Sequence, residues 1–124
     1  MKRILGILFL LILLSGCETA IDCATSDPPE IEERELPDGT LFNGYSATIE
    51  VYGNSDFAWQ DFRVEGTLPN GLDCHSFGDD IFISGTPTLL GDFEFTIKIK
   101  VKHDDEERNG CEYTISRNFR IHIS

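Results

Sequence analysis

Apolar and polar residues alternate with a period of two along most of the chain after residue 39. The clearest run has Phe93, Phe95, Ile97, Ile99 and Val101 on one face, with polar residues between them. Shorter runs of the same kind lie at 45–52, 62–64, 81–83 and 113–123, and turn-forming glycine, proline and asparagine residues separate them. This alternation is typical of half-buried strands, and no stretch of this region shows helical spacing. The pattern therefore predicts an all-β antiparallel sandwich of about seven strands.

Charge fixes the register of the last two predicted strands. When positions whose numbers sum to 214 are paired, Glu94 faces Arg120 and Lys102 faces Glu112 on the outer side. The same register places apolar residues opposite one another on the inner side, which is the arrangement a half-buried hairpin requires. Arg117 is the exception, because it falls on the inner side opposite Ile97. Either a β-bulge or an arginine that snorkels at the core edge would explain it.

Several turn motifs resemble those of immunoglobulin-like domains in bacterial surface proteins, relatives of the cadherin-like group. The matching pieces are Leu36-Pro-Asp-Gly-Thr, Gly44-Tyr-Ser-Ala-Thr-Ile, Gly66-Thr-Leu-Pro-Asn-Gly-Leu72, Ile83-Ser-Gly-Thr-Pro-Thr-Leu-Leu-Gly91 and Phe93-Glu-Phe-Thr-Ile. The resemblance covers residues 36–123 and implies an immunoglobulin-like β-sandwich used as a spacer, adhesive or recognition module. It supplies no catalytic motif. Members usually occur as tandem repeats, so a single copy is a less natural spacer.

The first sixteen residues form a segment of different character. Lys2 and Arg3 precede an apolar run at 4–14, which is typical of a secretory signal and too short to span a bilayer as a mature helix. The run ends in Leu14-Ser15-Gly16-Cys17, which resembles a bacterial lipobox. The resemblance implies cleavage after residue 16 and acylation of Cys17, with palmitate among the acyl chains. The residue after Cys17 is Glu18, whereas an aspartate at this position retains many enterobacterial lipoproteins at the inner membrane. We therefore expect an anchor in the outer membrane, on either its periplasmic or its surface face.

Acidic residues dominate the next segment, residues 17–38. Eight acids lie there against Arg34 alone, with Pro28-Pro29 and few large apolar residues. Such a composition predicts a flexible, extended linker, which leaves residues 39–124 as the folded domain. The whole chain has a formal charge of −12, and removal of Lys2 and Arg3 with the signal makes it −14. This balance argues against a nucleic-acid partner, because phosphate binding requires clustered cations.

Three cysteines remain after Cys17 is assigned to the anchor. Cys74 lies two residues after Leu72 and Cys111 two residues before Tyr113, so each cysteine is expected on the inward face of its strand. A Cys74–Cys111 disulfide is therefore the leading interpretation in an oxidising compartment. Two alternatives stay open: Cys23 pins the linker to the domain, or all three thiols are reduced. No cysteine or histidine has the close spacing of a zinc site.

Other candidate chemistry is sparse. Lys98, Lys100 and Lys102 form a basic stripe that could bind an anionic glycan or lipid phosphate, and Asp104 and Asp105 are weak calcium candidates in the last hairpin. An aromatic docking patch could include Tyr52, Phe57, Trp59 and Phe82, and the histidines at 75, 103 and 122 belong to no catalytic or metal motif. No acid–base pair or nucleophile motif indicates an enzyme, and no cofactor motif occurs. The sequence thus predicts a non-enzymatic, lipid-anchored binding module of the bacterial envelope with a protein or glycan partner. The alternative is a structural spacer or assembly subunit of a larger surface complex.

Overall fold

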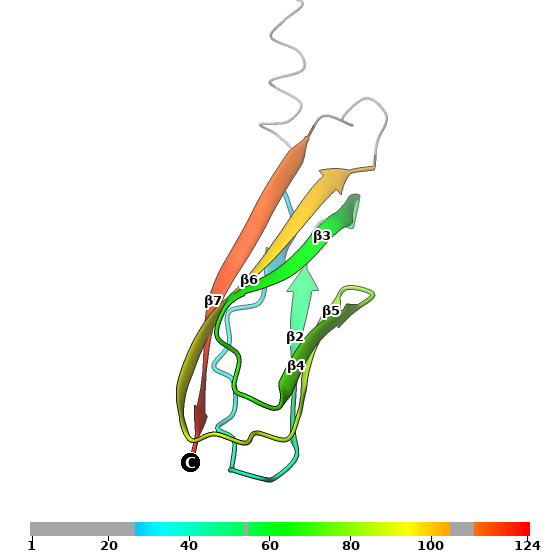
Figure 1. Cartoon of the computed structure of the whole chain (residues 1–124). Coiled ribbons are helices and arrows are strands. Elements are labelled where there is room, and N and C mark those ends of the chain that lie inside the picture. Colours follow the sequence, from blue (N-terminus) through cyan, green and yellow to red (C-terminus); the bar gives the residue numbers. More distant parts are fainter. Residues whose placement is uncertain (1–26, 54, 105–110) are drawn as a thin grey trace, which may run out of the picture.

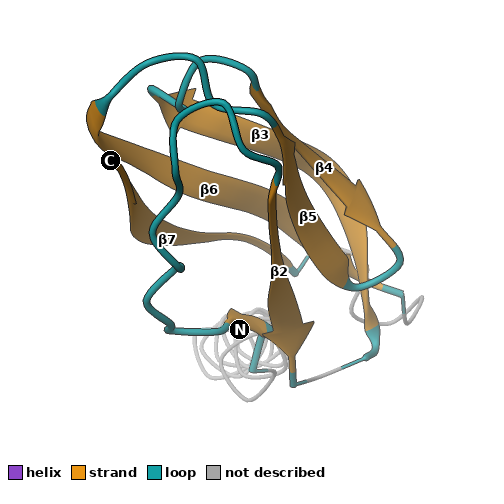
Figure 2. Cartoon of the chain, turned by 90° about the horizontal axis from the view of Figure 1, so that it is seen from below, coloured by secondary structure: helices purple, strands orange, loops and turns teal. Residues whose placement is uncertain are grey.

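Two antiparallel sheets make up the molecule in the computed structural model, which describes residues 27–53, 55–104 and 111–124 (Figure 1). The strands are β1 (Glu30–Ile31), β2 (Tyr45–Tyr52), β3 (Phe57–Gly66), β4 (Leu72–Phe77), β5 (Asp80–Gly85), β6 (Gly91–His103) and β7 (Glu112–Ile123). One sheet has the order β1-β2-β5-β4 and the other β3-β6-β7. Figure 2 shows the sheets facing one another, with loops at the ends of the strands. The predicted all-β sandwich of about seven strands is confirmed.

The predicted register of β6 and β7 is also confirmed. All twelve pairs from Gly91–Ile123 to Lys102–Glu112 follow it without a shift, so no bulge is needed at Arg117. The Arg117 side chain instead runs along the core edge to the N-terminal segment. Its Nε donates to the carbonyl oxygen of Ile31 at 3.1 Å, and its guanidinium lies 3.7 Å from Glu33. Arg117 is thus half-buried, with its charge directed to the edge of the sandwich.

The N-terminal boundary of the domain differs from the predicted one. Residues 27–38 belong to the folded unit, because β1 pairs with β2 and the side chains of Ile31 and Leu36 lie in the hydrophobic core. The 17–38 linker prediction is therefore wrong for its second half, while residues 17–26 lie outside the described residues. Composition misled here because the edge of β2 offers hydrogen bonds to this acidic segment, and its few apolar residues, Ile31 and Leu36, reach the core.

The core lies between the two sheets and consists of the inward residues of the alternating strands. Its fully buried members include Ile49, Ile81, Ile83, Ile97, Ile99, Val101, Ile121 and Ile123. Phe95 stacks on Phe119 with ring centroids 5.9 Å apart, as cross-strand neighbours in the register. No described buried side-chain nitrogen or oxygen lacks a hydrogen-bond partner. The alternation seen in the sequence therefore maps directly onto core and surface.

The two ends of the sandwich differ in what they contain. At one end, which we call the entry end, residue 27 begins the described chain, β6 ends and Cys111 precedes β7 (top of Figure 1). At the other end lie three loops, 40–44, 67–71 and 86–90, together with the end of β7. We call this second end the loop end. Because the strands run between the ends, the loop end lies a strand length away from where residue 27 begins.

Candidate binding surface at the loop end

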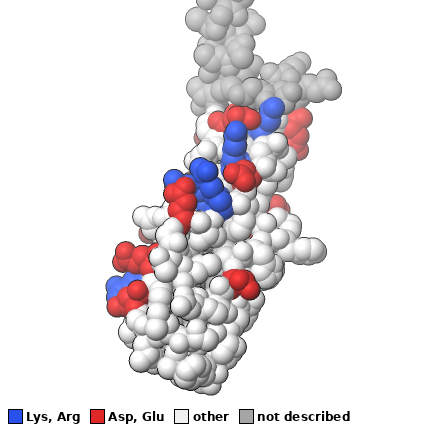
Figure 3. Space-filling model, in the orientation of Figure 1, with Lys and Arg blue, Asp and Glu red and all other residues white. Residues whose placement is uncertain are grey.

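The loop end is free of charged side chains. The three loops comprise Thr40-Leu-Phe-Asn-Gly44, Thr67-Leu-Pro-Asn-Gly71 and Thr86-Pro-Thr-Leu-Leu90, without one acid or base in a chain that is 26% charged. Figure 3 shows the same contrast on one face, where charged side chains lie mainly toward the upper half and the lower end is almost bare of them. Contact with a partner here would require no desolvation of charge, which is costly in a binding interface.

Backbone hydrogen bonds hold the three loops together. The Phe42 amide donates to the Pro87 carbonyl at 2.9 Å, which joins the first loop to the third. The Thr86 amide donates to Gly71 at 3.2 Å and the Thr88 amide to Asn70 at 2.9 Å, which joins the second loop to the third. Gly71 has φ +93°, and an added Cβ would fall on the Thr86 carbonyl oxygen. The loops therefore form one connected surface on a rigid frame.

Three large apolar side chains project from this surface. Phe42 is 69% exposed, Leu89 51% and Leu90 57%. Phe42 also has φ +64°, the only described non-glycine residue with a positive φ. Bulky residues rarely adopt this conformation, and strain of this kind is concentrated at functional positions. An exposed apolar cluster held on strained but hydrogen-bonded loops is typical of an interaction surface.

The predicted lysine stripe is placed on the outer face of the β3-β6-β7 sheet, and acids already pair with two of its members. Lys98 Nζ lies 2.9 Å from Glu65, and Lys100 Nζ lies 3.6 Å from Glu112. The hydrogen bond from Lys98 lowers the pKa of the Glu65 carboxyl. Lys102 faces Glu112 across the register. Binding of an anionic ligand at this stripe, which stays a prediction, would have to compete with these intramolecular pairs.

The predicted aromatic patch does not form. Phe57 is buried at the entry end, where its ring packs edge-on against the His103 ring with the ring centroids 4.9 Å apart. Trp59 packs partly against the core and stacks on Phe62, whereas Phe82 stacks on His75 in the other sheet. The prediction is wrong because these aromatic residues lie on strands of different sheets, a separation that sequence proximity does not reveal.

A groove lined by residues of the N-terminal segment (33–38), β6 and β7 contains a cluster of paired charges around Asp92. Asp92 accepts from His122 Nδ1 at 2.6 Å and pairs with Arg120 at 2.9 Å. These two hydrogen bonds lower the pKa of the Asp92 carboxyl. Arg120 thus contacts Asp92 and not Glu94, the residue opposite it in the register. Asp92, Arg120 and His122 thus form a cross-strand ion-pair network within the groove.

The calcium candidates divide between described and undescribed residues. Asp104 is exposed and its amide donates to the Asp56 carbonyl at 2.8 Å, whereas Asp105 lies outside the described residues. Within residues 27–53, 55–104 and 111–124, no three histidine, cysteine or acidic side chains are grouped closely enough to hold a metal. Calcium binding at this hairpin therefore stays an untested expectation.

The leading disulfide interpretation needs correction. Cys74 is a free thiol in β4, and burial raises its pKa to about 11, while Cys111 is disulfide-bonded. Cys74 therefore does not pair with Cys111. The physical reason is position, since Cys74 lies opposite Ile83 in the four-stranded sheet, whereas Cys111 lies at the entry end beside His103. Two cysteines that both face inward can still lie too far apart for the short Cα–Cα distance that a disulfide requires.

No family model matches the chain, and no curated protein matches it. Among solved structures, murine CRIg superimposes with a TM-score of 0.60 at 7% identity, covering 79% of this chain and 99% of that one. A candidate alpha-galactosidase from Bacteroides fragilis NCTC 9343 superimposes with a TM-score of 0.53 at 22% identity, over 77% of this chain. This chain spans only 17% of that protein. Both likenesses are below 25% identity and concern the fold alone.

The strand order, the register and these likenesses together define the class: the described part of the chain is an immunoglobulin-like β-sandwich. That part contains no helix long and apolar enough to cross a membrane. The loop end was not among the predicted sites. Its signal was present in the sequence as fifteen uncharged positions in three turns, two of which share the pattern Gly-Thr-Leu-x-Asn-Gly.

Proposed function

We propose that this protein is a non-enzymatic binding module that is anchored to the bacterial envelope by acylated Cys17 and contacts a partner protein through its loop end. The observation that carries the proposal is the exposure of Phe42, Leu89 and Leu90 on loops without charged side chains. Exposed apolar clusters of this kind occur at protein–protein contacts, whereas isolated exposed apolar residues are ordinary.

A protein is the favoured partner because two of the three projecting side chains are leucines. Recognition of sugar rings relies on flat aromatic faces, which leucine does not provide, whereas aliphatic and phenyl groups fill apolar pockets of proteins. The absence of charge at the loop end also argues against an anionic glycan or a lipid headgroup as its ligand.

The geometry suits an anchored module. Residue 27, the first described residue, lies at the entry end, so the segment that carries Cys17 joins the sandwich at the end opposite the loop end (Figure 1). A binding surface at the far end of a sandwich is accessible to partners even when the other end is close to lipid. A spacer would not need to expose apolar side chains there.

The binding proposal is tested by photo-crosslinking in intact cells. A photoreactive amino acid at position 89 should yield a discrete adduct whose mass increase is protein-like, and Phe42→Asn with Leu90→Ser should abolish it. Position 77 is the matched control, because Phe77 is 79% exposed but lies at the β4–β5 turn. A glycan adduct would contradict the choice of partner, and equal labelling from both positions, or none, would favour the spacer.

The anchor is tested separately. Metabolic labelling with an alkyne analogue of palmitate should tag the wild-type protein and leave it in the detergent phase. Cys17→Ser should lose the tag and move to the aqueous phase, while Cys74→Ser should behave like the wild type. Retention of the tag by Cys17→Ser would contradict acylation at this residue.

A further inference from the structure

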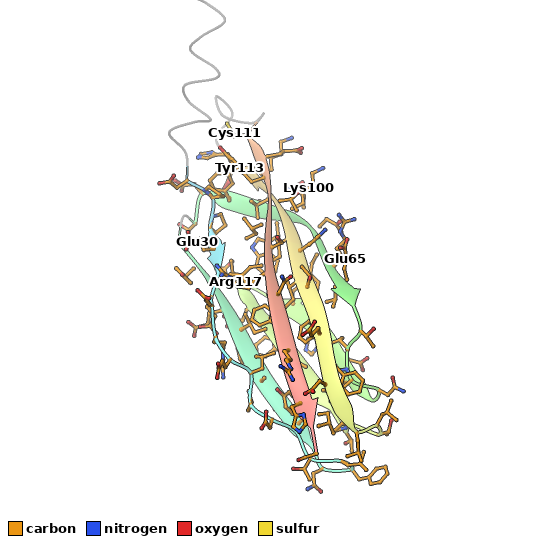
Figure 4. The ribbon with its side chains drawn as sticks, turned by 90° about the vertical axis from the view of Figure 1, so that its left-hand side faces the viewer. Glu30, Glu65, Lys100, Cys111, Tyr113 and Arg117 are labelled. Carbon is orange, nitrogen blue, oxygen red and sulfur yellow. The ribbon has the colours of Figure 1, made fainter. Side chains whose placement is uncertain are left out.

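Two Asn-Gly pairs lie at the loop end, at the opposite end of the sandwich from Cys111 (Figure 4). They are Asn43-Gly44 in the first loop and Asn70-Gly71 in the second, and all four residues are exposed. Asparagine followed by glycine cyclises readily, because glycine has no Cβ to hinder the attack of its backbone nitrogen on the asparagine side chain. The same local chemistry is thus present twice on one surface, and the surrounding structure determines which pair can react.

Backbone hydrogen bonds restrain the second pair. The Asn70 carbonyl oxygen accepts from the Thr88 amide at 2.9 Å and from the Thr88 hydroxyl at 3.4 Å. The Gly71 carbonyl accepts from the Thr86 amide at 3.2 Å, and the Thr86 carbonyl oxygen lies close against the Gly71 Cα. Cyclisation requires the peptide between Asn70 and Gly71 to turn until its nitrogen approaches Asn70 Cγ. Because that turn would break these hydrogen bonds, the folded protein opposes the reaction at Asn70.

The first pair is held on its N-terminal side alone. The Asn43 amide donates to the Thr40 carbonyl at 3.1 Å, which fixes the chain up to the Asn43 nitrogen. Of the hydrogen bonds between described residues, none involves the Asn43 carbonyl or the backbone of Gly44. An added Cβ at Gly44 would meet nothing within 4 Å, and the next fixed residue is the buried Tyr45, which begins β2. The peptide between Asn43 and Gly44 can therefore turn without breaking any contact of the fold.

We propose that Asn43-Gly44 is a deamidation site, at which the folded protein converts Asn43 to aspartate and isoaspartate. The Gly44 nitrogen loses its proton and attacks Asn43 Cγ; the N–Cγ bond forms, the Cγ–Nδ2 bond breaks, and ammonia leaves with the proton. A water molecule from the solvent then adds to either carbonyl of the five-membered ring, breaks that C–N bond and leaves a carboxylate. Water is the one co-reactant, and no oxidant or reductant takes part.

The product changes the charge of the loop end. It places a carboxylate next to Phe42 in loops that otherwise have no charged side chain. Phe42 is 69% exposed and belongs to the binding surface of the proposed function, on which this consequence rests. A carboxylate loses its hydration when an apolar partner covers it, so conversion of Asn43 lowers the affinity. A bound partner covers Asn43 as well, so we expect conversion mainly in modules that are unoccupied.

Peptide mapping of the full-length protein over time tests the site. The native protein is kept at mildly alkaline pH, which favours loss of the Gly44 proton, and is then cleaved after glutamate under mildly acidic conditions. Asn43 is the one asparagine of peptide 36–50, and Asn70 is the one asparagine of peptide 66–94. We expect conversion at least about tenfold faster in 36–50 than in 66–94, because the loss of one or two hydrogen bonds slows a reaction by about this factor.

The denatured protein shows whether the fold makes this difference. In guanidinium chloride both peptides should convert at similar rates, because the local sequence is then the same. Equal rates at Asn43 and Asn70 in the native protein would overturn the proposal, as would conversion of Asn43 in the denatured protein alone. Asn118 in peptide 113–124 is an internal control, because a phenylalanine follows it and its side-chain oxygen accepts from Thr96 at 2.6 Å. Conversion of Asn118 as fast as that of Asn43 would indicate unspecific hydrolysis and contradict the proposal.

Gly44→Ala is the matched variant for the reaction. It retains Asn43 and adds a methyl group in open space, where it hinders the attack of the residue-44 nitrogen. Conversion of Asn43 should therefore slow at least severalfold, while the urea midpoint stays that of the wild type. An unchanged rate of conversion in Gly44→Ala would contradict attack by this nitrogen.

The consequence for binding has its own measurement. Asn43→Asp reproduces one product, and it should give less crosslinking from position 89 than Asn43→Gln, which keeps the loop uncharged. Equal crosslinking in both variants would refute the effect of the charge on binding. Failure of the proposed function is distinguishable from these outcomes, because wild-type protein would then give no adduct at position 89, whereas conversion of Asn43 is measured without a partner.

Discussion

Replacing Gly71 by alanine tests whether the loop end is held as one rigid surface. Gly71 has φ +93°, outside the narrow left-handed region open to L-residues, and its added methyl group would meet the Thr86 carbonyl oxygen. Thr86 cannot shift freely, because its own amide donates to Gly71 at 3.2 Å. The substitution must therefore distort the second and third loops together.

The expected cost follows from these two effects. Backbone strain at such a φ is about 1–3 kcal/mol, and loss of a loop hydrogen bond adds about 1 kcal/mol. We therefore expect Gly71→Ala to lower the free energy of unfolding by about 3 kcal/mol, which shifts the urea midpoint by roughly 1–3 M. Fluorescence of Trp59, the single tryptophan, reports the transition.

Two other glycines provide matched controls. Gly78 has φ +61°, and an added Cβ would meet nothing within 4 Å, so Gly78→Ala should cost about 1 kcal/mol or less. Gly44 also has open space and no positive φ, so Gly44→Ala should be near neutral. Equal stability of all three variants would refute the reasoning. Crosslinking from position 89 should weaken in Gly71→Ala and persist in Gly44→Ala.

Three further substitutions test the electrostatics and the core. The Tyr45 hydroxyl donates to the Pro37 carbonyl at 2.8 Å, and burial raises the pKa of Tyr45 to about 12. Because the pKa of an unfolded tyrosine is near 10, the free energy of unfolding should fall by about 2–3 kcal/mol as the pH rises from 10 to above 12. In Tyr45→Phe this extra loss should vanish from urea titrations at pH 9–12, and an unchanged loss would contradict the assignment. His122 and Arg120 lower the pKa of Asp92, so the stability that the ionised carboxylate contributes is present at neutral pH and is lost as the pH falls below about 4. In Asp92→Asn the melting temperature should therefore decrease less steeply than in the wild type as the pH is lowered through this range. An equal decrease in both proteins would contradict this role of Asp92. Phe95→Ala, which removes a ring stacked on Phe119, should cost about 3–5 kcal/mol in urea, and a cost below 1 kcal/mol would contradict its place in the core.

The sandwich and its longest register were predictable from the chain. Alternation at 93–101 and 113–123 assigns each side chain to a face, because successive residues of a strand point to opposite sides. Charge pairing then selects one register among the possible ones, and the twelve pairs of β6 and β7 follow it. Such information is local, so no knowledge of the opposite sheet is needed.

The N-terminal segment shows where local information fails. Its acids and prolines indicate a linker, yet Ile31 lies in the core and Arg117 donates to the carbonyl oxygen of Ile31. The inward position of Arg117 was visible as an anomaly in the register. Its explanation required a partner 86 positions earlier in the chain, which only the tertiary arrangement supplies.

The sequence by itself determined the long alternating strands, their faces and the register of the last hairpin, because alternation and charge act between neighbouring residues and adjacent strands. It did not reveal β1, which lies in the acidic segment that was expected to be a linker. The tertiary structure decided that three uncharged loops distributed from residue 40 to residue 90 meet at one end, with Phe42 and Leu89 exposed. It also decided that Cys74 and Cys111 lie apart. These proximities arise from the packing of one sheet on the other, and no local pattern encodes that packing.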